Sequence, residues 1–167
     1  MDQTFSIAGE VATQGIEVAA AVRPIEGWKL WGNLAFLHTR YASFDALGLT
    51  GKTPSNVAPI VANAGASYRY EGWWWPVEIG GSMRHVGARF LTEFNDVTMD
   101  AYTVADAFMF VDIEKPALLP TVDKTRLAFR VRNLTNKTYA AFSDSGLPDQ
   151  VYLGAPRTYE VALSFKW

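Results

Sequence analysis

Cysteine is absent from this chain of 167 residues, and its basic residues never gather into a block. The lack of cysteine excludes a disulfide framework and a cysteine metal site. The lack of a basic block, with a formal net charge of −2, predicts no nucleic-acid partner. His38 and His85 are the two histidines, and neither has a carboxylate at metal-ligand spacing. We therefore expect neither a metal nor a cofactor.

Long apolar stretches and catalytic motifs are missing as well. No stretch approaches the roughly 18 consecutive apolar residues that indicate a membrane-spanning helix. The first four residues, Met1–Thr4, show no basic region followed by an apolar stretch, so no export signal is recognisable. The sequence contains no nucleophile elbow, P-loop or dinucleotide fingerprint. These absences predict a protein that is not an enzyme.

Aromatic residues, by contrast, are plentiful, with 10 Phe, 7 Tyr and 6 Trp. The dominant hydrophobic period is two, which is the period of a β-strand. The pattern blurs after His85, where a bulge would fit, and Phe5–Ile7 leaves room for part of an earlier strand. We predict an all-β protein with seven long, meandering antiparallel strands, at about residues 11–23, 27–44, 58–71, 76–92, 100–114, 124–141 and 151–167.

Several features of these strands favour a transmembrane β-barrel over a soluble sandwich. Some would reach about 13 to 18 residues, whereas soluble strands usually have roughly 5–6 and a membrane crossing takes about 9–11. Short turns alternate with long polar links, as they do when one rim of a barrel carries turns and the other carries loops. Aromatic residues gather at both strand ends, as in the girdles of such barrels: Trp28, Tyr68, Tyr70, Trp73, Trp74, Trp75 and Trp167 at the turn ends, and Phe36, Tyr41, Phe44, Phe90, Phe94, Tyr139 and Phe142 at the loop ends.

Charged residues predict which face of each strand points into the barrel. Arg126, Arg130 and Arg132 share one face of a single predicted strand. Facing lipid near the middle of the bilayer, each would cost roughly 2–4 kcal/mol, and together they would rival the stability of a whole domain. We therefore expect a lumen-facing, structural position for these three residues, and by the same reasoning for Lys29, Arg69 and Arg84.

Motifs near the end of the chain resemble a known family. Asn133–Tyr139, with the sequence NLTNKTY, is similar to the "N-L-x-N-K-x-Y" signature of TonB-dependent outer-membrane receptors. Gly154–Thr158, with the sequence GAPRT, resembles that family's "G-x-P-R-T" entry to the last strand. Softer matches precede them in the family's order, at Gly15–Val18, Thr53–Pro59, Val86–Phe90 and Tyr102–Asp106. The resemblance is closest to the ferric-siderophore receptors.

The final residues resemble a second feature of outer-membrane proteins. Apolar residues alternate with polar ones up to a terminal aromatic, similar to the C-terminal signal that the barrel-assembly machinery reads. The residues that would form this assembly signal are Tyr159, Val161, Leu163, Phe165 and Trp167.

The resemblance implies active import across the outer membrane of a Gram-negative bacterium, with lipid around the barrel. In such receptors a barrel of about 22 strands holds a plug domain in its lumen, and an inner-membrane TonB complex pulls on a segment ahead of the plug. Residues 1–167 match the C-terminal portion of the barrel domain, and we expect the plug to be absent. The TonB complex and the ferric siderophore would then be partners only through the full-length receptor, and no ligand-binding residue is predicted.

The segment by itself is expected to be inactive, an open curved sheet whose two unpaired edges invite aggregation. Two other interpretations remain open. A small closed outer-membrane barrel with a structural or adhesion role would need an eighth strand from residues 1–9, to reach an even count. A soluble ligand-binding protein of the lipocalin type would partition into buffer as a stable monomer.

Overall fold

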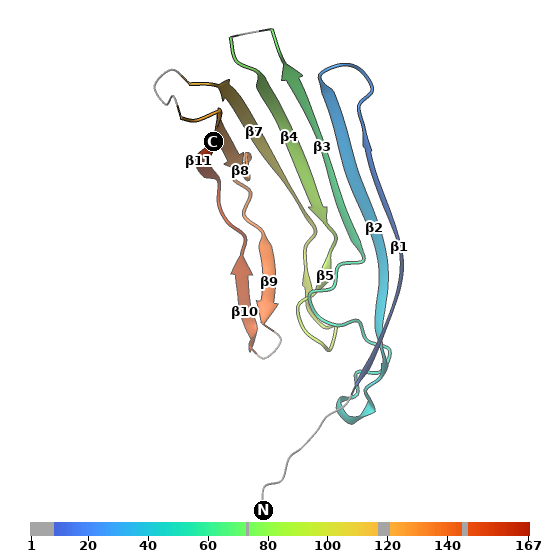
Figure 1. The fold of residues 1–167 in the computed structure, drawn as a ribbon. Helices are drawn as coiled ribbons and strands as arrows, with labels where there is room; N and C mark the ends of the chain where they lie inside the picture. The colour runs from blue at the N-terminus through green and yellow to red at the C-terminus, as the bar shows by residue number, and fades with distance from the viewer. Residues whose placement is uncertain (1–8, 73, 117–120, 145–146) are drawn as a thin grey trace, which may run out of the picture.

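In the computed structural model of this protein, one antiparallel sheet dominates the chain (Figure 1). The structure describes residues 9–72, 74–116, 121–144 and 147–167. The early strand expected at Phe5–Ile7, and Trp73 of the expected aromatic girdle, lie outside these residues. The strands of the sheet, in spatial order, are β1 (Glu10–Val22), β2 (Trp28–Ser43), β3 (Ile60–Tyr70), β4 (Val77–Val86), β7 (Tyr102–Glu114), β8 (Lys124–Arg132) and β11 (Thr158–Lys166).

Four shorter strands form two hairpins apart from the main sheet. β5 (Arg89–Phe90) pairs with β6 (Thr98–Met99), and β9 (Ala140–Asp144) pairs with β10 (Leu147–Leu153). A 3-10 turn, η1 (Asp45–Leu47), lies in the link between β2 and β3. Within the described part of the chain, no helix has the length and apolar character needed to cross a membrane. The all-β, antiparallel prediction is confirmed.

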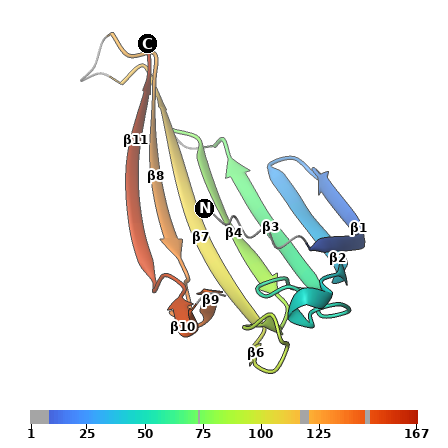
Figure 2. The same ribbon diagram turned by 90° about the horizontal axis from the view of Figure 1, so that it is seen from below.

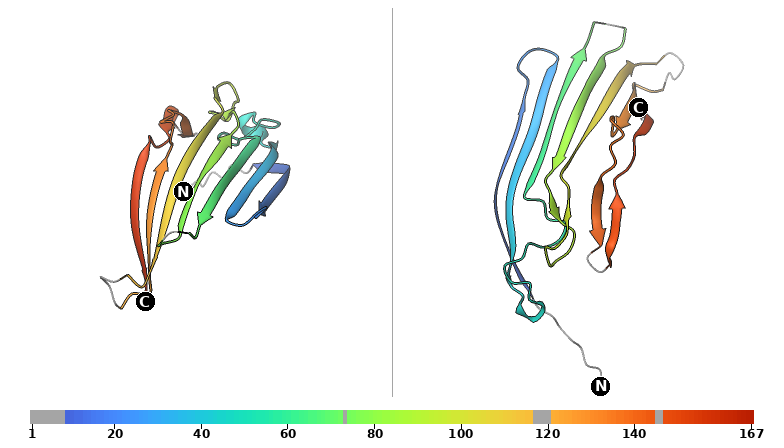
Figure 3. Two further views of the ribbon diagram at one scale, coloured as in Figure 1. Left: turned by 90° about the horizontal axis from the view of Figure 1, so that it is seen from above. Right: turned by 180° about the vertical axis from the view of Figure 1, so that it is seen from behind.

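The connections separate to the two ends of the sheet. The turn that joins β1 to β2 lies at one end of the sheet, called here the turn end, where β3 and β7 also end and β4 and β8 begin (Figures 1 and 3). The link from β2 to β3 and both small hairpins lie at the other, the loop end. Figure 2 shows the sheet as a curved wall with β1 and β11 at its opposite edges. The sheet is open, because these two strands do not pair with each other.

Strand register sorts the side chains onto two faces, since residues opposite each other in a ladder point to the same side. Asp112 lies opposite Arg126, and Glu78 lies opposite both Arg69 and Phe110, which places charged groups from four strands on one polar face. The other, apolar face carries large side chains that are 37–68% exposed: Ile16, Val18, Leu30, Phe36, Ile79, Met83, Phe129, Val161 and Leu163. An apolar surface of this extent is typical of contact with a membrane or a partner.

Three predicted strands are interrupted, and the prediction that they were continuous is wrong. Residues 76–92 divide into β4 and β5, residues 124–141 into β8 and β9, and residues 151–167 into β10 and β11. The bulge considered after His85 is in fact the first of these breaks. Alternation persists on both sides of each break, so a period of two could not reveal where the pairing stops.

Each break has a local physical cause. After Val86 the N–H of Gly87 still donates to the carbonyl of Ile60, but the next opposing residue is Pro59, which has no N–H to continue the ladder. After β8 the chain turns through Asn133 and Asn136, whose φ angles of 49° and 52° are incompatible with an extended strand. Pro156 separates β10 from β11, and it too removes a ladder donor. The hairpins at the loop end can therefore pack against one another instead of extending the sheet.

The most buried apolar side chains lie at the loop end. Tyr102 stacks on Tyr139 with ring centroids 4.2 Å apart, so Tyr139 belongs to this core and not to the predicted outer girdle. We call residues 44–59, 87–101 and 137–144, with the strand ends beneath them, the cap. Six of the seven buried apolar residues in the described ranges belong to it: Leu49, Ala58, Val86, Leu91, Met99 and Tyr102.

Candidate functional site: the polar face of the sheet

The six basic residues predicted to share a lumen-facing side all lie on the polar face. They come from four strands: Lys29 from β2, Arg69 from β3, Arg84 from β4, and Arg126, Arg130 and Arg132 from β8. The register brings them to one surface because each strand contributes every second residue. That this surface lines a lumen stays a prediction.

Two of these six meet at Asp112, the most buried charged residue of the described chain, at 1% exposure. Its Oδ1 accepts a hydrogen bond from Nε of Arg126 at 2.7 Å. Its Oδ2 accepts from Nη2 of Arg126 and from Nη1 of Arg69, both at 2.9 Å, and lies 3.3 Å from Nζ of Lys124. Arg69 reaches this carboxylate across β4, so the network ties β3 to β7 and β8. Three cations offset the cost of burying one carboxylate.

An aromatic band crosses the polar face beside this network. Phe108 and Phe110 break the polar alternation of β7, and their rings stack with centroids 4.9 Å apart. The ring of Trp31, from β2, lies 6.4 Å from that of Phe108. Cations rest on both ends of the band, with Arg130 5.2 Å from the centre of the Phe110 ring and Lys29 5.6 Å from that of Trp31. The band explains how aromatic residues are accommodated among charges.

Two glycines seat these rings flat against the sheet. A Cβ at Gly65 would lie 2.3 Å from the Trp31 ring, and a Cβ at Gly80 would lie 2.5 Å from the Phe108 ring. At Gly80 the added carbon would also meet the backbone oxygen of Ala66 at 2.6 Å. Backbone cannot move aside as a side chain can, so Gly80 is the more constrained of the two positions, whereas at Gly65 the added carbon would displace only the Trp31 ring.

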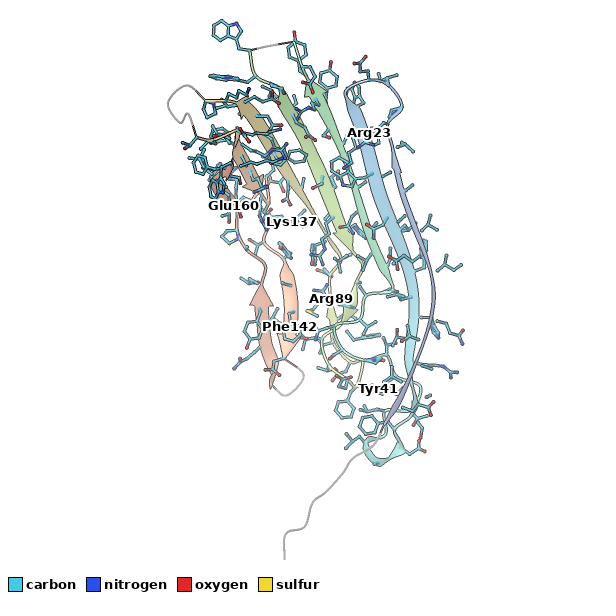
Figure 4. All side chains as sticks on the ribbon, viewed as in Figure 1. Arg23, Tyr41, Arg89, Lys137, Phe142 and Glu160 are labelled. Carbon is cyan, nitrogen blue, oxygen red and sulfur yellow. The ribbon has the colours of Figure 1, made fainter. Side chains whose placement is uncertain are left out.

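The other two basic residues are more exposed. Arg132 pairs with Glu160 of β11 at 2.8 Å, with side chains 60% and 35% exposed. Glu160 lies on the last strand, β11 (Figure 4). Arg84 lies opposite Asn63 and Val104 in the ladders on its two sides. An exposed ion pair of this kind contributes about 0–1 kcal/mol. The Arg132–Glu160 pair therefore stabilises the sheet less than the network around Asp112 does.

The NLTNKTY motif forms a tight turn between β8 and β9 and binds the segment that enters β11. Asn133 is 4% exposed, and its amide accepts from the Lys137 N–H and donates to the carbonyls of Lys137 and Ala155. Its own N–H donates to Asp106 of β7 at 2.8 Å. Asn136 then accepts from the N–H of Arg157 at 2.9 Å. The side-chain amides of both asparagines therefore bind backbone groups, which is a structural role.

The five residues of the expected assembly signal lie along and just beyond β11. Tyr159, Val161, Leu163 and Phe165 alternate with Glu160 and its neighbours, so they occupy the apolar face. Their exposures are 70%, 67%, 58% and 45%, and Trp167 is 84% exposed. β11 is also an edge of the sheet, so the strand presents both apolar side chains and unpaired backbone groups.

The sequence analysis did not single out Asp112, whose carboxylate binds Arg69 and Arg126 and lies close to Lys124. A signal was available, because Asp112 and Arg126 lie at equal distances from the turn between β7 and β8 and therefore face each other in the hairpin. The sequence also missed the polar contacts that hold the cap, where the partners come from different loops.

Glu93 is one of those contacts. It accepts hydrogen bonds from the Tyr41 hydroxyl at 2.6 Å and from N and Oγ of Ser55 at 3.1 and 2.7 Å. Burial alone would raise the pKa of Glu93, but the hydrogen bonds from Tyr41 and Ser55 outweigh it and lower the pKa below its ordinary value. The carboxylate of Glu93 is therefore held in its charged form. Figure 4 shows its partner Tyr41 at the lower end of the sheet.

The described residues offer no arrangement that would hold a metal, since no three His, Asp or Glu side chains gather suitably within them. His85 instead shares a hydrogen bond of 2.9 Å with the hydroxyl of Thr103. The site is a surface of fixed cations, rings and donors. Such a surface can bind and orient a polar or acidic partner.

Comparison with known proteins gives a consistent result. The family model described as TonB dependent receptor-like, beta-barrel, matches residues 2–134. A ferrioxamine receptor from Yersinia enterocolitica is 25% identical over 163 residues, which is 95% of this chain and 21% of the relative. The chain therefore spans about a fifth of that relative's length.

Solved structures share the fold. BauA, the ferric preacinetobactin receptor from Acinetobacter baumannii, superposes with a TM-score of 0.79 at 24% identity, over 94% of this chain and 22% of the receptor. FyuA, the ferric yersiniabactin uptake receptor from Yersinia pestis, gives 0.67 at 15% identity, over 93% of this chain and 22% of the receptor. The open sheet is thus similar to a section of the wall of much longer receptors.

Proposed function

We propose that this chain, which belongs to the TonB-dependent receptor-like β-barrel family, forms part of an outer-membrane receptor that imports a ferric siderophore. The observation that carries the proposal is the family match over residues 2–134, on a sheet whose two faces differ sharply in polarity. The named relative is a ferrioxamine receptor, which makes a ferric hydroxamate the first substrate to test.

The two faces support a place in a membrane wall. A sheet that buries charged groups on one side and exposes aliphatic side chains on the other fits between a polar lumen and lipid. On this proposal the arginine–aspartate network and the aromatic band face the lumen, and the apolar face contacts outer-membrane lipid. Outer-membrane barrels have short turns on the periplasmic side and longer loops outside, so on this proposal the turn end faces the periplasm and the cap faces the outside.

We further propose that residues 1–167 are the C-terminal portion of the barrel domain, and that the rest of a longer receptor supplies the plug and the remaining strands. The open edges at β1 and β11 support this, because an unpaired backbone group in lipid costs several kcal/mol. The TonB complex and the siderophore would engage the full-length receptor, and the barrel-assembly machinery would recognise the final strand through Tyr159, Val161, Leu163, Phe165 and Trp167.

Iron uptake tests the function directly. The gene that contains this chain is disrupted in its own bacterium, and uptake of ⁵⁵Fe is measured with ferrioxamine, preacinetobactin, yersiniabactin and citrate as carriers. We expect uptake from one carrier to fall to background, to return with the intact gene, and to be lost equally when TonB is removed. Unchanged uptake from all four carriers would overturn the proposal.

The isolated segment provides a separate test of the domain assignment. Residues 1–167 produced alone should collect as aggregate, and co-production with the missing portion of the receptor should bring the segment into the outer membrane. A stably folded monomer of the segment alone in detergent would contradict this assignment while leaving the uptake experiment to decide the function.

A further inference from the structure

Asn56 joins two loops that are far apart in the sequence. Its side chain lies against Ser143 of β9: Nδ2 donates to the Ser143 carbonyl at 2.8 Å, and Oδ1 accepts from the Ser143 N–H at 2.9 Å. The amide thus satisfies both backbone groups of one residue, as a neighbouring strand would. Asn56 has a φ of 62°, and its own N–H donates to the carbonyl of Phe90. Ser143 is fully buried.

Asn95 makes the same kind of two-bond contact, called here a clasp, between a second pair of the three loops. Its Oδ1 accepts from the N–H of Thr53 at 2.8 Å, and its Nδ2 donates to the Thr53 carbonyl at 2.7 Å. Its φ is 59°. Both clasps therefore use an asparagine in the left-handed conformation, which asparagine tolerates better than most residues. Two independent occurrences of one geometry, on adjacent loops, point to a common role.

Arg89 closes the third side of this assembly. It is 4% exposed, and its Nη2 donates to the carbonyls of Ala140 and Ala141 at 2.7 and 2.8 Å. Its guanidinium lies 5.4 Å from the centre of the Tyr102 ring. Figure 4 shows Arg89 between β5 and β9. The Ser143 hydroxyl also donates to the carbonyl of Leu91 at 2.9 Å. The three loop segments are thus connected pairwise.

We infer that Asn56 and Asn95 are positioning residues that join the three long loops into one rigid body, so that the cap is already folded when a ligand arrives. The cap has what a small folded unit needs, since it holds a buried apolar core and satisfies the backbone of each loop with a side chain from another. A mobile loop would instead show few buried contacts and solvated backbone groups.

This inference goes beyond the proposed function and rests on it only for its consequence in uptake. On that proposal the cap forms the outer rim, so ligands would meet a preformed opening. The affinity for ligand would then depend on the clasps, and the rate of transport through the barrel would not.

Hydrogen–deuterium exchange in isolated outer membranes tests the rigid body without any ligand. Asn56→Gly and Asn95→Gly each remove a clasp but keep a residue suited to positive φ. Asn136→Gly is the matched control, because Asn136 also has positive φ (52°) but bonds Arg157 outside the cap. Retention of the folded, heat-modifiable band in electrophoresis verifies that each variant still assembles.

In the unmodified protein we expect peptides containing Thr53 and Ser143 to be protected. Either clasp variant should raise exchange roughly tenfold or more at both peptides, and the control should leave both unchanged. Exchange of the unmodified peptides at the rate of free loops would overturn the inference. The inference would also be overturned if each variant raised exchange only in the peptide of its own partner, because the two asparagines would then make separate contacts and would not join the loops into one body.

The uptake consequence is measured with ⁵⁵Fe-ferrioxamine. Asn56→Gly should raise the ferrioxamine concentration for half-maximal uptake several-fold and leave the maximal rate unchanged, whereas a general loss of folded receptor would lower the maximal rate. An unchanged half-maximal concentration would overturn the proposal that the clasps raise the affinity for ligand. If the unmodified receptor takes up no ferrioxamine, the substrate proposal fails, and the exchange data still decide the rigid body.

Discussion

Replacement of Asp112 by asparagine should be among the most damaging single changes on the polar face. Asparagine keeps the shape of the side chain but removes the negative charge. Asp112 is 1% exposed and accepts from Arg69 and Arg126, with Lys124 3.3 Å away. The substitution would leave Lys124 and Arg126 beside Arg69 without the shared carboxylate, and Arg69 would keep only its exposed partner Glu71. The expected loss therefore combines a lost attraction with a new repulsion.

The size of the loss follows from burial. Removing one partner of a buried ion pair costs about 3–5 kcal/mol. The three cations here have side chains 30–43% exposed, so water screens part of their repulsion and the lower part of that range applies. We expect the free energy of unfolding to fall by about 3 kcal/mol. The matched control is Glu160→Gln, because Glu160 lies on the same face in an exposed pair with Arg132 and should cost about 0–1 kcal/mol.

Urea titration of the full-length receptor in detergent micelles, followed by tryptophan fluorescence, measures both changes. The difference between the variants should persist in high salt, because a buried network is screened less than an exposed pair. A double-mutant cycle with Arg126→Gln should give a coupling energy above about 1 kcal/mol. If Asp112→Asn and Glu160→Gln cost the same within about 0.5 kcal/mol, the network does not stabilise the wall and the reasoning is refuted.

Three further predictions concern packing, pH and assembly. Gly80→Ala should lower the free energy of unfolding by about 1–3 kcal/mol, because the added carbon would contact the Phe108 ring and the backbone. In the control Gly81→Ala, the added carbon would contact only one backbone oxygen, at 3.0 Å, and the loss in the same titration should be clearly smaller. Hydrogen bonds lower the pKa of Glu93 in the folded protein, so its stabilisation of the cap is present above the ordinary pKa of 4.5 and is lost as the pH falls through the lower folded value. Protection of the cap against hydrogen exchange should therefore drop in that pH range, and Glu93→Gln should abolish the drop. Removal of Trp167 should reduce the folded receptor in the outer membrane several-fold, measured by heat-modifiability, and an unchanged yield would count against the assembly signal.

Much of the candidate site follows from local rules. The positions of Arg126, Arg130 and Arg132 on one face follow from the two-residue period of a strand, which no tertiary contact alters. Hairpin symmetry about the link between β7 and β8 then determines that Asp112 opposes Arg126. The third cation could not be found in this way, because Arg69 reaches Asp112 across β4 and the reach depends on side-chain conformation.

The sequence by itself determined the all-β class, the two faces of the wall and the alternation of turns and loops. These features depend on residues close together along the chain, where periodicity and turn preference operate. Only the tertiary structure decided where strands break and how the cap is held. Asn56 meets Ser143 across 87 positions, and Asn95 meets Thr53 across 42. The sequence analysis singled out neither asparagine, and their partners are selected by the packing of three loops, which no local pattern encodes.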